Sequence, residues 1–106
     1  MHNIKTNFDK ILEVIKDIVG DEINTNGNYI RRGTVPKFSD IEVIALSLTA
    51  ECLSIDSENY LFSKLRTEYQ NEFKNIISRR QYNDRRKLLF EKTERVRKLM
   101  AESLNK

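Results

Sequence analysis

The chain has 106 residues, of which 39% are hydrophobic and 33% charged, with a formal net charge of +3. This length fits one domain of the usual size, and the apolar content is too high for a disordered tail. One cysteine and one histidine exclude an internal disulfide and a zinc ligand set, and no apolar run reaches the roughly 20 residues of a membrane span.

The pattern of helix breakers predicts an all-α fold. Only one proline and three glycines occur, and no run alternates β-branched and polar residues as a half-buried strand does. We therefore expect a single helical domain over residues 1–106, a small multi-helix bundle with a helix-turn-helix-like C-terminal half. The unpaired cysteine and the lack of a signal sequence favour a cytoplasmic setting without membrane contact.

The first predicted helix covers residues 1–20. Apolar side chains recur from Phe8 to Val19 at the spacing of one helical face. Thr6 stands where an N-cap is expected, and Gly20 is a natural stop. Residues 21–38 then form a predicted connector, which holds the turn-forming residues Asn26, Gly27, Gly33 and Pro36.

The bundle predicted over residues 39–106 begins with a central helix. Ser39 and Glu42 have the spacing of a capping box. Five residues share the apolar face of this helix: Ile41, Ile44, Ala45, Leu48 and Cys52. Because Cys52 lies on that face, we expect it to be a buried structural thiol and not a nucleophile.

Two further helices are predicted after the central one. Asp56 or Ser57 caps the first of them, whose expected core residues are Leu61, Phe62 and Leu65. A short turn with Phe73, Ile76 and Ile77 follows.

Ser78 and Gln81 form a second predicted capping box, which begins the last and longest helix. Its apolar face holds Tyr82, Leu89, Val96, Met100 and Leu104.

Positive charge is concentrated in this last helix. Residues 78–98 contain nine Lys or Arg against three acids, a local charge of +6, so the rest of the chain sums to −3 from ten basic and thirteen acidic residues. Such an asymmetry indicates that one element faces an anionic partner.

No residue set supports catalysis. Acid–base or nucleophilic chemistry needs a histidine or paired carboxylates, or a base beside a nucleophile. The acids Asp40, Glu42, Glu51, Asp56 and Glu58 stand near predicted helix starts, where the helix dipole already explains them. We expect a non-enzyme without a metal or other cofactor.

The residues of the last helix suit double-stranded DNA. Arg79, Arg80, Gln81 and Asn83 lie in its first turns, the part of a recognition helix that meets base edges. Arg85, Arg86 and Lys87 would then contact phosphates.

Two other interpretations remain open. The same charges are typical of a solvated helix face, in which Arg80 with Asp84 or Lys87 with Glu91 would form ordinary i, i+4 pairs. A protein-interaction or regulatory bundle, including a homo-oligomer, would then be the better description. A helix lying on a membrane is less favoured, because the apolar face lacks tryptophan.

Part of the sequence resembles a known family. PKFSDIEVIALSLTAECLSIDSENYLFSKL and NIISRRQYNDRRKLL are similar to the N-terminal region of DDE transposases from small bacterial insertion sequences. The matching positions are Pro36, Ser39, Asp40, Glu42, Val43, Ile44, Ile55 to Glu58, Ser78, Arg79, Tyr82, Asn83, Arg85 and Arg86.

The resemblance implies an all-α, helix-turn-helix-like domain that binds the terminal inverted repeats of the element. In that family a separate RNase H-like domain holds the Asp-Asp-Glu metal site, and we expect no such catalytic domain in this chain. Asp84 stands where the family is usually basic.

Overall fold

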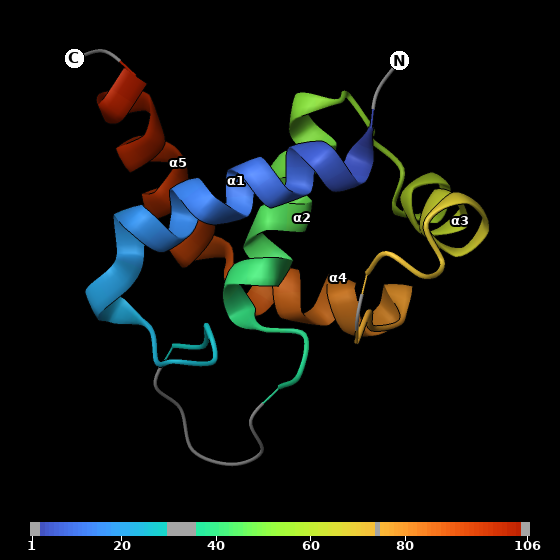
Figure 1. The fold of residues 1–106 in the computed structure, drawn as a ribbon, viewed down its shortest axis with the longest axis horizontal. Coiled ribbons are helices and arrows are strands. Elements are labelled where there is room, and N and C mark those ends of the chain that lie inside the picture. Colours follow the sequence, from blue (N-terminus) through green and yellow to red (C-terminus); the bar gives the residue numbers. More distant parts are fainter. Residues whose placement is uncertain (1–2, 30–35, 74, 105–106) are drawn as a thin grey trace.

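A computed structural model of the chain describes residues 3–29, 36–73 and 75–104. These residues form five α-helices and no strand: α1 (Ile4–Val19), α2 (Asp40–Cys52), α3 (Glu58–Glu68), α4 (Arg79–Leu88) and α5 (Phe90–Leu104). The predicted all-α fold is confirmed. In Figure 1, α2 crosses behind α1, α4 runs below them, and α3 and α5 lie at opposite ends of the molecule. Part of the expected connector, residues 30–35, lies outside the described residues.

The core is built around α2. Ile44, Ala45 and Leu46 have no exposed surface, and the prediction that Ile41 and Leu48 are buried is also confirmed. Burial extends around most of this helix because α1 packs on one side and α4 on another. All five helices contribute buried side chains to one core cluster.

The prediction that Cys52 is buried is wrong. Cys52 is exposed, and it is the last residue of α2. Its helical position does continue the apolar face, but the buried residues of α2 end at Ala50. Periodicity gives the direction of a side chain and not the length over which another helix covers it.

The predicted cap of α1 is also wrong. The helix begins at Ile4, and the Oδ1 of Asn3 accepts a hydrogen bond from the backbone N–H of Thr6 (2.9 Å). Asn caps helices at least as well as Thr, so a start three residues earlier satisfies the same rule and adds Ile4 to the core. α1 ends at Val19, and a short 3₁₀ helix, η1 (Gly20–Glu22), follows.

The last predicted helix is in fact two helices. The chain turns at Leu89 between α4 and α5, so α1, with 16 residues, is the longest helix among the described residues. Leu89 itself is buried, as expected, and its backbone N–H closes the end of α4 on the carbonyl of Arg85. The turn lets α4 pack against α2 while α5 packs against α1, and Tyr82 and Val96 are buried on these two helices.

The predicted helix-turn-helix geometry is not supported by the connection between α3 and α4. Between the end of α3 at Glu68 and the start of α4 at Arg79 lie the ten residues 69–78, whereas that motif joins its helices by a turn of about 3 to 4 residues. Phe73 anchors this link, because its ring packs edge-on against the ring of Phe8 on α1 at 4.9 Å.

None of the described helices is long and apolar enough to cross a membrane.

Candidate nucleic-acid interface

The first turn of α4 lies at the surface. Ser78 Oγ accepts a hydrogen bond from the backbone N–H of Gln81 (3.1 Å), and Gln81 Oε1 accepts one from the backbone N–H of Ser78 (3.1 Å). This capping box, predicted from the sequence, satisfies donors that have no partner within the helix. Arg79, Arg80 and Gln81 are exposed, so the cap starts α4 on a turn that solvent can reach.

Tyr82 fixes the inner face of α4. Its side chain is 2% exposed, and its ring packs against the ring of Phe62 on α3 at a centroid distance of 5.1 Å. Burial raises the pKa of the Tyr82 phenol to about 12. The phenol therefore stays neutral at ordinary pH and serves as a packing residue, as the sequence predicted.

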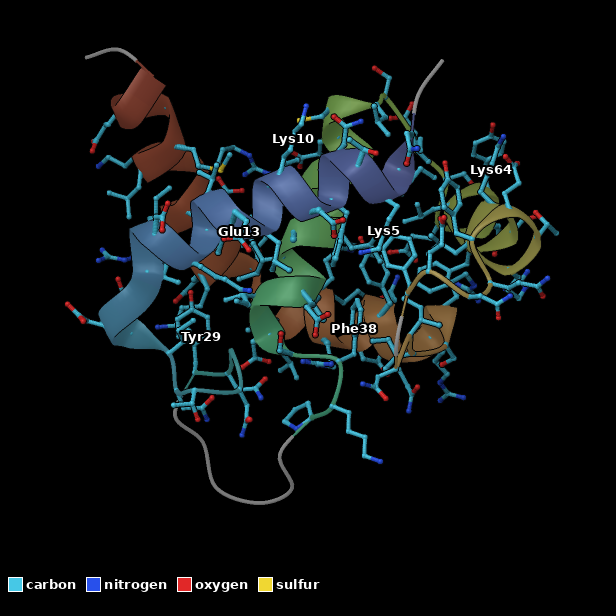
Figure 2. The ribbon with its side chains drawn as sticks, viewed as in Figure 1. Lys5, Lys10, Glu13, Tyr29, Phe38 and Lys64 are labelled. Atoms are coloured by element: carbon cyan, nitrogen blue, oxygen red, sulfur yellow. The ribbon has the colours of Figure 1, made fainter. Side chains whose placement is uncertain are left out.

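A buried ion pair ties α4 to the start of α2. The Arg85 guanidinium donates from Nη2 to Asp40 Oδ1 (2.9 Å) and from Nη1 to the carbonyl of Phe38. Phe38 lies at the start of α2, beside α4 (Figure 2). The Asp40 side chain is fully buried and that of Arg85 is 15% exposed. Arg85 is therefore engaged inside the protein, whereas the sequence suggested a phosphate contact.

The same carboxylate also holds the connector. Asp40 Oδ2 accepts a hydrogen bond from the backbone N–H of Tyr29 (3.0 Å), and the backbone N–H of Asp40 donates to Asn28 Oδ1 (2.8 Å). Asp40 is also the first residue of α2, where a negative charge is favoured by the helix dipole. One buried aspartate thus joins the connector, α2 and α4.

A second carboxylate ties α4 to α3. Glu58, the first residue of α3, accepts at Oε1 from Asn83 Nδ2 (2.7 Å) and at Oε2 from Arg86 Nε (3.1 Å). Arg79 Nη1 lies 3.8 Å from the same Oε1. These three partners are one and two turns apart on α4, so Glu58 contacts one edge of the helix and offsets one of its two positive charges.

The outer edge of α4, which runs along Arg80, Asp84 and Lys87, keeps two cations without an ion pair among the described residues. Arg80 and Lys87 are exposed, and no described carboxylate lies within 4.0 Å of either cation. The pairs of Arg80 with Asp84 and of Lys87 with Glu91 are thus not formed among the described side chains. The two cations stand two helical turns apart, which separates them by about 10 Å along the helix axis.

The seven residues that the sequence assigned to DNA therefore fall into three groups. Arg80 and Lys87 are exposed and unpaired among the described residues, and Arg79 is exposed with a long contact to Glu58. Gln81 is exposed, but its side-chain oxygen is used in the cap. Asn83, Arg85 and Arg86 donate to Glu58 or Asp40 and are only partly exposed.

Sequence reasoning missed the partners of these residues. Asp40 and Glu58 were explained as acids at helix starts, which they are, but each also binds α4, at separations of 45 and 25 residues along the chain. No local pattern signals such a pairing. Lys37 was also not singled out; it is exposed and lines a groove beside α4 together with Asn75 and Gln81.

The chain matches no model of a known protein family, and neither a curated protein nor a solved structure shows significant similarity to it. The resemblance to transposases thus has no support from these comparisons. The function must therefore be inferred from the residues of the chain and their contacts.

Proposed function

We propose that this protein is a non-catalytic DNA-binding domain that contacts double-stranded DNA through the outer edge of α4. The observation that carries this proposal is the asymmetry of the helix. Asp40 and Glu58 engage the basic residues on its inner edges, whereas Arg80 and Lys87 lie beyond ion-pair distance of every described carboxylate. Exposed cations at this spacing suit a row of backbone phosphates.

The charge distribution supports the same surface. The excess of six positive charges in residues 78–98 lies in α4 and α5, while the remaining residues are net acidic. Acids from the rest of the chain pair with four of these arginines, so the attraction of a polyanion rests on the cations that stay unpaired. Lys37 adds a further exposed cation beside α4.

The geometry favours phosphate contacts over base reading. A bidentate contact with adenine needs both the oxygen and the nitrogen of a Gln or Asn side chain. The oxygen of Gln81 is held by Ser78, and the nitrogen of Asn83 is held by Glu58. Arg79 and Arg80 remain as the side chains that reach base edges, so we expect affinity for duplex DNA with modest sequence preference.

The proposal is tested by the salt dependence of duplex binding. Each phosphate neutralised adds about −0.9 to the slope of log affinity against log salt concentration. Arg80→Gln and Lys87→Gln should each flatten the slope by about 1. Fluorescence anisotropy with a labelled duplex measures this.

Lys10→Gln is the matched control, because Lys10 is an exposed cation on α1, far from α4 in Figure 2. It removes the same charge and should leave the slope unchanged. The proposal fails if Lys10→Gln and Lys87→Gln act alike, or if the double variant Arg80→Gln/Lys87→Gln binds duplex as the parent does.

The second candidate function is a protein-interaction module. Leu88 and Phe90, on either side of the turn between α4 and α5, are 79% and 59% exposed. Adjacent large apolar side chains at a surface are typical of contact sites. Under this alternative, Leu88→Ser with Phe90→Ser would abolish self-association in sedimentation velocity, and duplex affinity would not depend on Arg80 or Lys87.

A further inference from the structure

The Glu58 carboxylate contacts polar and basic side chains of α4 in the way that a phosphate group would. Both of its oxygens are engaged, Oε1 by Asn83 and Oε2 by Arg86, with Arg79 at 3.8 Å from Oε1. A carboxylate and a phosphate are interchangeable partners for guanidinium groups, because each presents two oxygens at similar spacing. The edge of α4 that carries Arg79, Asn83 and Arg86 could extend a DNA interface, but the Glu58 carboxylate already binds it.

Arg79, Arg86 and Glu58 are partly exposed, so another anion can replace Glu58 in its contacts with the two arginines. The side chains of Arg79, Arg86 and Glu58 are 47%, 38% and 21% exposed. Ion pairs that water reaches are weak and screened by salt. The pair of Arg85 and Asp40 differs, because it is almost fully buried and its separation would leave a buried charge.

The groove beside Arg79 and Arg86 also carries acidic residues, which oppose the entry of a phosphate. Arg79 and Arg86 line a groove between α2, the start of α3 and α4, together with the acids Glu51, Asp56 and Glu58. A phosphate at the surface can still reach both guanidinium groups without movement of the α4 backbone, because exposed arginine side chains change rotamer readily.

We propose that Glu58 sets the affinity of the α4 surface for nucleic acid by competing with backbone phosphates for Arg79 and Arg86. This inference rests on the proposed function. In the free protein Glu58 accepts a hydrogen bond from Arg86 and lies 3.8 Å from the guanidinium of Arg79. A phosphate that takes them leaves the Glu58 carboxylate unpaired beside a polyanion, and this repulsion weakens binding. The chain therefore binds duplex DNA less tightly than its count of arginines suggests.

The test compares Glu58→Gln with Glu51→Gln. Both changes remove one negative charge from the same region, but Glu51 pairs with Arg97 on α5, and Arg97 keeps a second partner in Glu94. Glu58→Gln frees up to two arginines for phosphates, so the salt slope should steepen by about 1 to 2. The ratio of affinities at 50 and 200 mM salt then rises by about 4-fold to 16-fold. Glu51→Gln should leave the slope unchanged.

A double-mutant cycle shows whether the gain passes through the arginines. Arg86→Gln should barely change the slope in the parent, where Glu58 holds Arg86, and should remove part of the gain in the Glu58→Gln background. Thermal unfolding is recorded for every variant. If Glu58→Gln unfolds, Arg86→Gln and Lys87→Gln in the parent still test whether Glu58 keeps Arg86 from phosphates. Only Lys87→Gln should then flatten the slope.

The outcomes separate this inference from the proposed function. If Glu58→Gln binds as Glu51→Gln does, or if Arg86→Gln flattens the slope of the parent as much as Lys87→Gln, the competition by Glu58 is refuted while DNA binding stands. If neither the parent nor Glu58→Gln shows salt-dependent binding of duplex, the proposed function and this inference both fail.

Discussion

Asp40 and Glu58 both bind α4, but the loss of each contact should have a different effect because the two carboxylates differ in burial. Asp40 is fully buried and Glu58 is 21% exposed at the side chain. A buried charge that loses its partner cannot be solvated, whereas a partly exposed one can. Residues that look equivalent in the sequence, such as Arg85 and Arg86, therefore have different roles.

Arg85→Gln should lower stability more than it lowers DNA affinity. The change removes the ion pair and the hydrogen bond that Arg85 makes to the buried Asp40. Breaking a buried pair in this way costs about 3 to 5 kcal/mol in the free energy of unfolding. Urea denaturation measures the loss, with Lys87→Gln, at an exposed cation on the same helix, as the control. Equal stability of the two variants would contradict the structural role of Arg85.

Tyr82 should make the fold sensitive to alkali. Burial raises its pKa in the folded protein from 10.0 to about 12. The unfolded chain therefore loses this proton first, and stability should fall as pH rises from about 10 to about 12, by up to about 3 kcal/mol. Burial also raises the pKa of Tyr29, so Tyr82→Phe should remove only part of the fall. A denaturation series over pH 9 to 12 that is flat in the parent would contradict this.

The elements themselves were largely predictable, because their start signals are local. Both capping boxes, at Ser39 and Ser78, are present, and Ser57 caps α3. The turn at Leu89 was not predictable, because no glycine or proline marks it. It follows from tertiary packing, which requires α4 and α5 to reach different neighbours. The exposure of Cys52 also follows from tertiary packing, because the neighbouring helices determine where the burial of α2 ends.

Ile44 tests the central place of α2. It is fully buried where α2 packs against α1 and α4, so Ile44→Ala should lower the free energy of unfolding by roughly 2 to 5 kcal/mol. Ile76→Ala makes the same change at a side chain that is 36% exposed and should cost much less. Chemical denaturation of both variants checks the difference. A loss as small at Ile44 as at Ile76 would mean that α2 is not the core helix.

For the molecule as a whole, the sequence located the basic element but not which of its cations are available. The charge asymmetry of residues 78–98 is visible in the sequence. The engagement of Arg85 and Arg86 depends on acids 45 and 28 residues away, and only the packing of α4 against α2 and α3 brings them together. Composition therefore overstates the positive surface of α4, which consists mainly of Arg79, Arg80 and Lys87, with Lys37 beside them.

A DNA-binding role for the outer edge of α4 is tested most directly by a backbone amide NMR titration of the parent protein with a short DNA duplex at low salt. We expect the largest shift changes on Arg79, Arg80 and Lys87, with Lys37 next, and we expect them to reverse when salt is added. The face of α1 around Lys10 should not respond. Shift changes centred on α1, or confined to Leu88 and Phe90 and insensitive to salt, would contradict this role.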